Sequence, residues 1–181
     1  MARSIDIEYY ADKWLSMELL PEWQPEISLA VRLVKENDNL YAEASRRTGI
    51  PKWFFGPLHY REGSCKPNRQ ILNGEDFQKK TTIVPIGLGP FADWAQAAEI
   101  AAEQGEWKKC ATWSIAGALQ FYEKHNGYGY RNMGLDSPYV FRGSTHCLDV
   151  GKFVADHKYD PNAKDKQLGC ACILKGMFPE R

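Results

Sequence analysis

The stretch FFGPLHYREGSC, residues 54–65, begins as an apolar run and ends on a carboxylate directly before a glycine. Upstream, Gly49 suits the end of one helix, and Pro51 suits the first turn of the next. Because Gly63 is a natural stop, the pattern predicts a helix from residue 51 to residue 63 with an apolar, buried body. Glu62 then lies in the last turn of that helix.

A carboxyl group in this position has a chemical use. Aromatic neighbours partly desolvate Glu62, so we expect its pKa to be raised, as the general acid of a glycosidase requires. On a helix His59 shares the face of Glu62, whereas Arg61 points away, so His59 is the better candidate for tuning that pKa. Two structural alternatives remain open: a surface turn in which Glu62 pairs with Arg61 or His59, and a buried histidine with no role in chemistry.

Apolar residues recur at helical spacing along most of the chain. Helices are predicted at about 4–20, 25–48 with a break at 37–39, 51–63, 91–104, 114–125 and 162–177, with a loop over 128–160. The Asn-Gly pair at 73–74 and the run TTIVP favour a small β-hairpin at about 70–86. The expected fold class is therefore mainly α, an α+β helical domain with one small β element.

Composition narrows the functional classes. The 181 residues, 44% of them hydrophobic, fit one globular domain, residues 1–181. Lys plus Arg and Asp plus Glu both number 23, so no net field attracts nucleic acid. The acidic N-terminal region does not have the pattern of a signal peptide, and no apolar run has the length of a membrane span. We expect a chain made in the cytoplasm.

The five cysteines do not predict a disulfide framework, because their number is odd and their spacing irregular. Cys170 and Cys172 form a CxC pair, but no histidine lies near them, and zinc ligands are usually spaced as CxxC. We read both as small buried helix residues and expect neither a metal nor a cofactor.

Other residues, distant from Glu62 in the sequence, are candidates for the same site. Glu75 and Asp76 lie on the expected β element, where a second carboxylate could face the first. Tyr128, Tyr130 and Tyr139 lie on or near a glycine-rich loop, and loop aromatics suit stacking on sugar rings. The alternative for these tyrosines is packing in the core under a long loop.

Several motifs in fixed order resemble a known family. They are GIPKWFFGPLHYREGS, LNGEDFQKKTTIVP, GPFADWAQAAE, ALQFYEKHNGYGYR, SPYVF and KFVADHKYDPNAKDKQLGCA. Together, over residues 49–177, they resemble peptidoglycan-cleaving muramidases of the lysozyme-like superfamily, common among phage endolysins. Residues 1–48 carry little of the resemblance and are expected to be N-terminal helices packed on the same domain.

The resemblance implies hydrolysis of the β-1,4 bond between N-acetylmuramic acid and N-acetylglucosamine. Glu62 takes the place of the catalytic glutamate, and Glu75 is the first choice for the second carboxylate, with Asp76 next to it. The segment YEKHNGYGY resembles the superfamily's groove-lining segment. The implied substrate-binding residues are His59, Ser64, Asn126, Tyr128, Tyr130 and Tyr139. Two departures are Gly63, which separates Glu62 from Ser64, and Phe141, where Trp is frequent.

The resemblance implies that the protein is a monomer and that its partners are peptidoglycan glycan strands. If it is a phage product, a holin would let it reach the cell wall. Three alternatives remain open. A lytic transglycosylase would use Glu62 alone, a non-catalytic phage or cell-wall component would bind glycan with its aromatics, and a chitin-cleaving enzyme would differ only in substrate.

Overall fold

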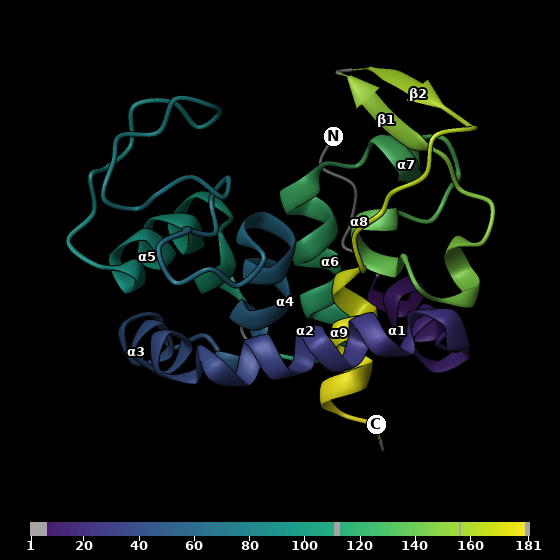
Figure 1. The fold of residues 1–181 in the computed structure, drawn as a ribbon, viewed down its shortest axis with the longest axis horizontal. Coiled ribbons are helices and arrows are strands. Elements are labelled where there is room, and N and C mark those ends of the chain that lie inside the picture. The colour runs from purple at the N-terminus through teal and green to yellow at the C-terminus, as the bar shows by residue number, and fades with distance from the viewer. Residues whose placement is uncertain (1–6, 111–112, 156, 180–181) are drawn as a thin grey trace. The chain divides into compact units, whose positions relative to one another are not determined.

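A computed structural model describes residues 7–110, 113–155 and 157–179 (Figure 1). These residues are mainly helical, with one small antiparallel sheet, as predicted. They form two compact units. The discontinuous unit comprises residues up to Ser28 and from Ser114 onward, and the continuous unit is Leu29–Trp113.

The elements follow one another in this order. They are α1 (Ile7–Ser16), η1 (Pro21–Trp23), α2 (Gln24–Glu36), α3 (Asp38–Thr48), α4 (Lys52–Gly63), α5 (Trp94–Gln104), η2 (Trp107–Lys109), α6 (Ile115–Asn126), α7 (Gly129–Asn132), α8 (Pro138–Phe141), η3 (Thr145–Cys147), β1 (Lys152–Ala155), β2 (Lys158–Asp160) and α9 (Cys170–Met177). The predicted break at residues 37–39 is confirmed between α2 and α3, and the helix that ends at Gly63 is confirmed as α4. None of the described helices is long and apolar enough to cross a membrane.

In the discontinuous unit, α6 packs against α1, α8 and α9. Its core includes Trp14, Leu119, Tyr122, Phe141 and Ile173, all at most 6% exposed. The CxC cysteines are buried at the start of α9, in agreement with their interpretation as small helix residues. Cys65, Cys147 and Cys172 are buried free thiols.

The small sheet lies elsewhere than predicted. Strands β1 and β2 pair within residues 128–160, which we expected to be a loop, with Phe153 opposite Tyr159. The ring of Tyr130 makes edge contacts with both of these aromatics, at centroid distances of 4.9 and 6.2 Å. These contacts stabilise a hairpin too short to show a period in its sequence.

The prediction of a hairpin at 70–86 is wrong in location. That stretch has no strand and a single β-bridge, between Arg69 and Asp76. The side chains of Gln70 and Glu75 accept hydrogen bonds from nearby backbone amides, and that of Asn73 donates to a backbone carbonyl. These local side-chain contacts take the place of hydrogen bonds between strands.

The final helix is shorter than predicted because its first part is built from turns. Asp160 accepts a hydrogen bond from the Asn162 amide at 2.8 Å, and Asp165 accepts one from the Gln167 amide at 3.0 Å. These aspartate turns hold the chain in a non-helical path until Cys170.

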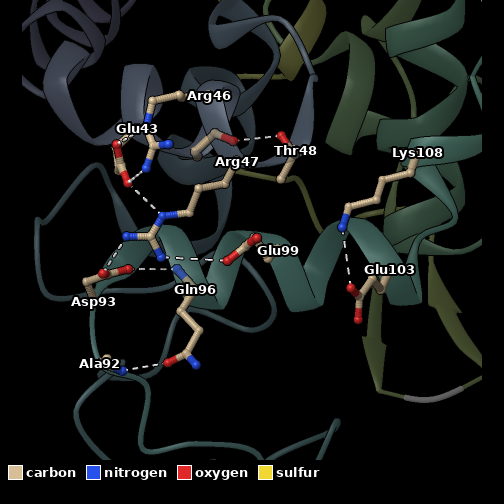
Figure 2. Close-up of polar contacts among 11 residues, drawn as sticks. Glu43, Arg46, Arg47, Thr48, Ala92, Asp93, Gln96, Glu99, Glu103 and Lys108 are labelled. Atoms are coloured by element: carbon tan, nitrogen blue, oxygen red, sulfur yellow. Dashed lines mark hydrogen bonds and ion pairs between the residues drawn. The ribbon is translucent and has the colours of Figure 1, made fainter.

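In the continuous unit, α3 packs against α4 and α5. Figure 2 shows how charged side chains join α3 to the start of α5. Arg47 donates to Glu43 and to Asp93, each at 2.6 Å, and lies 3.6 Å from Glu99. Asp93 also caps α5 by accepting from the Gln96 amide, and Arg47 holds the pKa of its carboxyl below the ordinary value. The N-terminus of α5 is thereby fixed to α3.

Candidate active site

Helix α4 is enclosed by protein over most of its length. Residues 54–60 are all buried, including Gly56. A Cβ on Gly56 would lie 2.5 Å from Cγ1 of Val34, so only glycine allows α2 to approach α4 this closely. An amphipathic surface helix carries charged residues on its polar face, but a helix buried on every side has no such face. Glu62 is thus a carboxylate at the end of an otherwise buried helix.

Glu62 is half-buried in the last turn of α4. Ser64 caps the C-terminus of the helix. It is exposed, its backbone is left-handed (φ 51°), and its amide donates to the carbonyls of His59 and Tyr60. Ser64 thus serves the helix end through its backbone. Cys65 continues the left-handed turn (φ 54°), which directs the chain back toward α4.

The loop that follows folds back on the end of α4. Gly74 has a positive φ of 74°, and an ideal Cβ there would lie 2.1 Å from the carbonyl oxygen of Glu62. Trp94 fixes the same loop by donating from its indole to the Arg69 carbonyl at 2.8 Å. The structure therefore places Gly74, the residue directly before the acidic pair at residues 75–76, against the backbone of Glu62.

The carboxylate of Glu75 is heavily hydrogen-bonded. It accepts from the amide and the hydroxyl of Thr82 (2.6 Å from the hydroxyl), from the Ile83 amide at 3.2 Å and from the Asn73 side chain at 3.1 Å. The hydrogen bond from the Thr82 side chain is the main cause that lowers the pKa of Glu75. Glu75 is therefore ionised at neutral pH and closes the loop that runs to residue 83.

Asp76 has fewer partners. It accepts from the Gln78 amide at 2.9 Å and from the Asn68 side chain at 3.2 Å, and the first of these bonds is the main cause that lowers its pKa. Both neighbouring carboxyl groups are thus ionised at neutral pH. Their ionisation state therefore does not distinguish Glu75 from Asp76 as the second carboxylate beside Glu62.

His59 is fully buried between two hydrogen-bond partners. Its Nε2 lies 3.0 Å from the Lys66 carbonyl, which only accepts, so Nε2 carries the proton. Nδ1 then accepts from the Tyr41 hydroxyl at 2.9 Å. Burial lowers the pKa of His59 to about 4. With both nitrogens engaged and no exposed surface, His59 fits the structural alternative rather than substrate binding.

The other predicted site residues belong to the discontinuous unit. Asn126 ends α6 and is exposed, and Tyr128, at 37% exposure, presents part of its ring to solvent. Tyr130 and Tyr139 are each only 6% exposed. The Tyr130 hydroxyl accepts from the Phe153 amide at 3.1 Å. Of the three tyrosines, Tyr128 alone retains a surface suited to stacking, and the other two match the core-packing alternative.

Sequence reasoning missed a buried ionic cluster in the discontinuous unit. Glu123 is 1% exposed and accepts from the Tyr10 hydroxyl at 2.6 Å and from Arg131 at 3.2 Å. The guanidinium of Arg131 also lies over the rings of Tyr9 and Tyr10. Glu123 follows Tyr122 and interrupts the apolar spacing of its helix. A charged residue in that position was the sequence signal for a buried, paired carboxylate. The cluster joins α1, α6 and α7.

Thr82 was also missed, because TTIVP was interpreted as a strand rather than as the partner of Glu75. Within the described residues, no group of three or more His, Cys, Asp or Glu side chains is arranged to hold a metal ion. A scan against protein-family models finds no match to the chain, and searches of curated proteins and of solved structures find none either.

Proposed function

We propose that the protein is a peptidoglycan hydrolase of the muramidase type, with Glu62 as general acid. The observation that carries the proposal is the contact of Gly74 with the Glu62 carbonyl, which holds an acidic loop against the end of a buried helix. Cleavage of a glycosidic bond by direct hydrolysis needs two carboxyl groups, one of them ionised. The lowered pKa values of Glu75 and Asp76 supply the ionised one.

In this mechanism Glu62 donates its proton to the leaving oxygen while the oxocarbenium-like transition state forms. Glu75 or Asp76 orients the attacking water on the opposite face of the sugar and accepts its proton as general base. In glycosidases generally, carboxyl groups roughly 6.5 to 9.5 Å apart leave room for that water and invert the anomeric centre, whereas about 5 to 5.5 Å gives retention. The stereochemistry of the product therefore reports the working separation.

A lytic transglycosylase is the second candidate, and the bonding of Glu75 favours it. Both oxygens of Glu75 already accept hydrogen bonds from the loop, which competes with the polarisation of water. If Glu75 only closes the loop and Asp76 does not assist, Glu62 acts first as acid and then as base. The product is then an anhydro sugar, lighter than the hydrolysis product by one water.

The test is turbidity loss of outer-membrane-permeabilised Gram-negative cells, followed by mass spectrometry of digested peptidoglycan. The set is wild type, Glu62→Gln, Glu75→Gln and Asp76→Asn, with exposed Glu22→Gln as the matched control and circular dichroism as the check of folding. We expect wild type and the control to lyse cells and folded Glu62→Gln to lose at least a hundredfold in rate.

The products then separate the candidates. Hydrated muropeptides, with a loss of rate in either Glu75→Gln or Asp76→Asn, support the hydrolase, and the affected variant identifies the base. Anhydro products with both of these variants active support the transglycosylase. A wild-type protein that binds peptidoglycan without cleaving it, or a Glu62→Gln variant as fast as wild type, contradicts both enzymatic proposals.

A further inference from the structure

A short loop in the continuous unit exposes aliphatic side chains to solvent. Ile83, Val84 and Ile86 are 54, 80 and 70% exposed, and we refer to these three residues as the aliphatic tip. Single exposed apolar residues are ordinary on protein surfaces, but a contiguous group usually marks an interaction site. These three residues lie within four positions of one loop.

The tip is held outward by its base. Thr81, 2% exposed, donates its amide to the Leu88 carbonyl and accepts from the Gly87 amide, both at 2.9 Å, which closes the loop. The Asn73 side chain donates to the carbonyl of Ile83 at 3.1 Å. Because these bonds already fix the backbone, binding through the tip costs little ordering entropy.

Two lysines immediately precede the loop. Lys79 and Lys80 are exposed, and neither amine forms an ion pair with any residue that the structure describes. The other exposed pair of consecutive lysines in this unit differs, because Lys108 pairs with Glu103 at 3.3 Å and Lys109 pairs with Glu106. The charge of Lys79 also helps to lower the pKa of Asp76, but no ion pair with a described residue holds either amine, so both can contact an anionic partner.

We propose that the aliphatic tip inserts into the interface of an anionic lipid membrane while Lys79 and Lys80 contact its headgroups. Aliphatic side chains flanked by basic ones have the chemistry of interfacial membrane binding. A glycan would need hydrogen-bonding or aromatic side chains, which the tip does not have. Protein hot spots favour Trp, Tyr and Arg rather than Val. The zero net charge of the chain means that insertion, more than long-range attraction, supplies the affinity.

The test is co-sedimentation of the full chain with vesicles of phosphatidylcholine mixed with phosphatidylglycerol in equal parts, compared with phosphatidylcholine alone. Wild type is expected to bind the anionic vesicles more tightly. The triple variant Ile83→Ser/Val84→Ser/Ile86→Ser is expected to bind them roughly tenfold or more weakly. Lys79→Gln/Lys80→Gln is expected to lose on the order of fivefold per lysine and to lose the preference for anionic lipid.

Two matched controls accompany these variants. Leu15→Ser changes one residue that is 79% exposed in the discontinuous unit, and Lys108→Gln/Lys109→Gln removes the ion-paired lysines. Both are expected to bind as wild type does, and thermal unfolding followed by circular dichroism confirms that each variant is folded. No binding of wild type to anionic vesicles overturns the proposal. So does a folded triple variant that binds vesicles normally but loses binding to purified peptidoglycan, because the tip then recognises glycan. Neither result depends on whether the protein cleaves peptidoglycan.

Discussion

The backbone of Glu62 and that of Gly74 are in direct contact, with the Gly74 Cα beside the Glu62 carbonyl oxygen. This contact couples the end of α4 to the loop that carries Glu75. It needs glycine for two reasons: the positive φ of 74° and the absence of room for a Cβ. The relative position of the candidate carboxylates thus depends on one residue without a side chain.

Gly74→Ala is expected to destabilise the protein by about 2 to 4 kcal/mol, the sum of left-handed strain and a steric clash with backbone. Gly87→Ala is the matched control, since Gly87 has a similar φ of 83° but a Cβ added there would meet nothing within 4 Å. The control should lose only about 1 to 2 kcal/mol. Urea unfolding measures both variants. Equal losses would show that the contact with Glu62 contributes nothing.

The stability contributed by Glu75 is expected to depend on pH. Its pKa is lowered in the folded state, so its carboxylate stabilises the fold above the ordinary glutamate pKa, about 4.3, and this contribution disappears as the pH falls through the folded value. The difference in unfolding free energy between wild type and Glu75→Gln should therefore be constant near neutral pH and shrink in acid. Glu8→Gln, at an exposed position of the discontinuous unit, is the control. A difference that stays constant down to about pH 3, below the ordinary glutamate pKa, would contradict the hydrogen-bonding role.

His59 is expected to destabilise the fold at mildly acidic pH. Its folded pKa of about 4 lies below the ordinary 6.5, so the unfolded chain binds the proton first as the pH falls. Stability should fall by up to about 3 kcal/mol between pH 6.5 and pH 4 and then level off. His59→Gln should be less stable at neutral pH yet show a flatter profile, whereas exposed His157→Gln should retain the wild-type slope. Parallel profiles for wild type and His59→Gln would refute this expectation.

The ion pair of Glu123 and Arg131 is expected to be costly to break. Arg131→Met leaves a carboxylate that is 1% exposed without its cation, and losses of about 3 to 5 kcal/mol are typical of that change. The double variant Glu123→Leu/Arg131→Met removes both charges and should lose less than the single variant. Thermal and urea unfolding provide the comparison. Glu123→Leu alone completes the cycle. A double variant that loses as much as Arg131→Met and Glu123→Leu together would indicate that the two groups are energetically independent.

Much of the fold could be predicted from the sequence because its signals are local. The helix from residue 51 to Gly63, the break at residues 37–39 and the helical class follow from apolar spacing, glycine and proline. The sequence also selected Glu62, as a carboxylate at the end of an apolar helix. It selected Glu75 and Asp76 from their place on the expected β element and from the family resemblance. Their proposed catalytic roles remain predictions.

Only the tertiary structure decided the rest. Whether TTIVP forms a strand depends on Glu75 and Asn73, whose side chains bind its backbone across a turn. The location of the hairpin depends on the aromatic contacts of Tyr130. His59 is buried against Tyr41, and Glu123 pairs with Arg131. No local sequence pattern indicates that these residues come together. Sequence determined the ends of a helix where glycine or proline marks them, as at Gly63, because those preferences act within a few residues. Burial, partners and the late start of α9 at Cys170 depend on how distant segments pack.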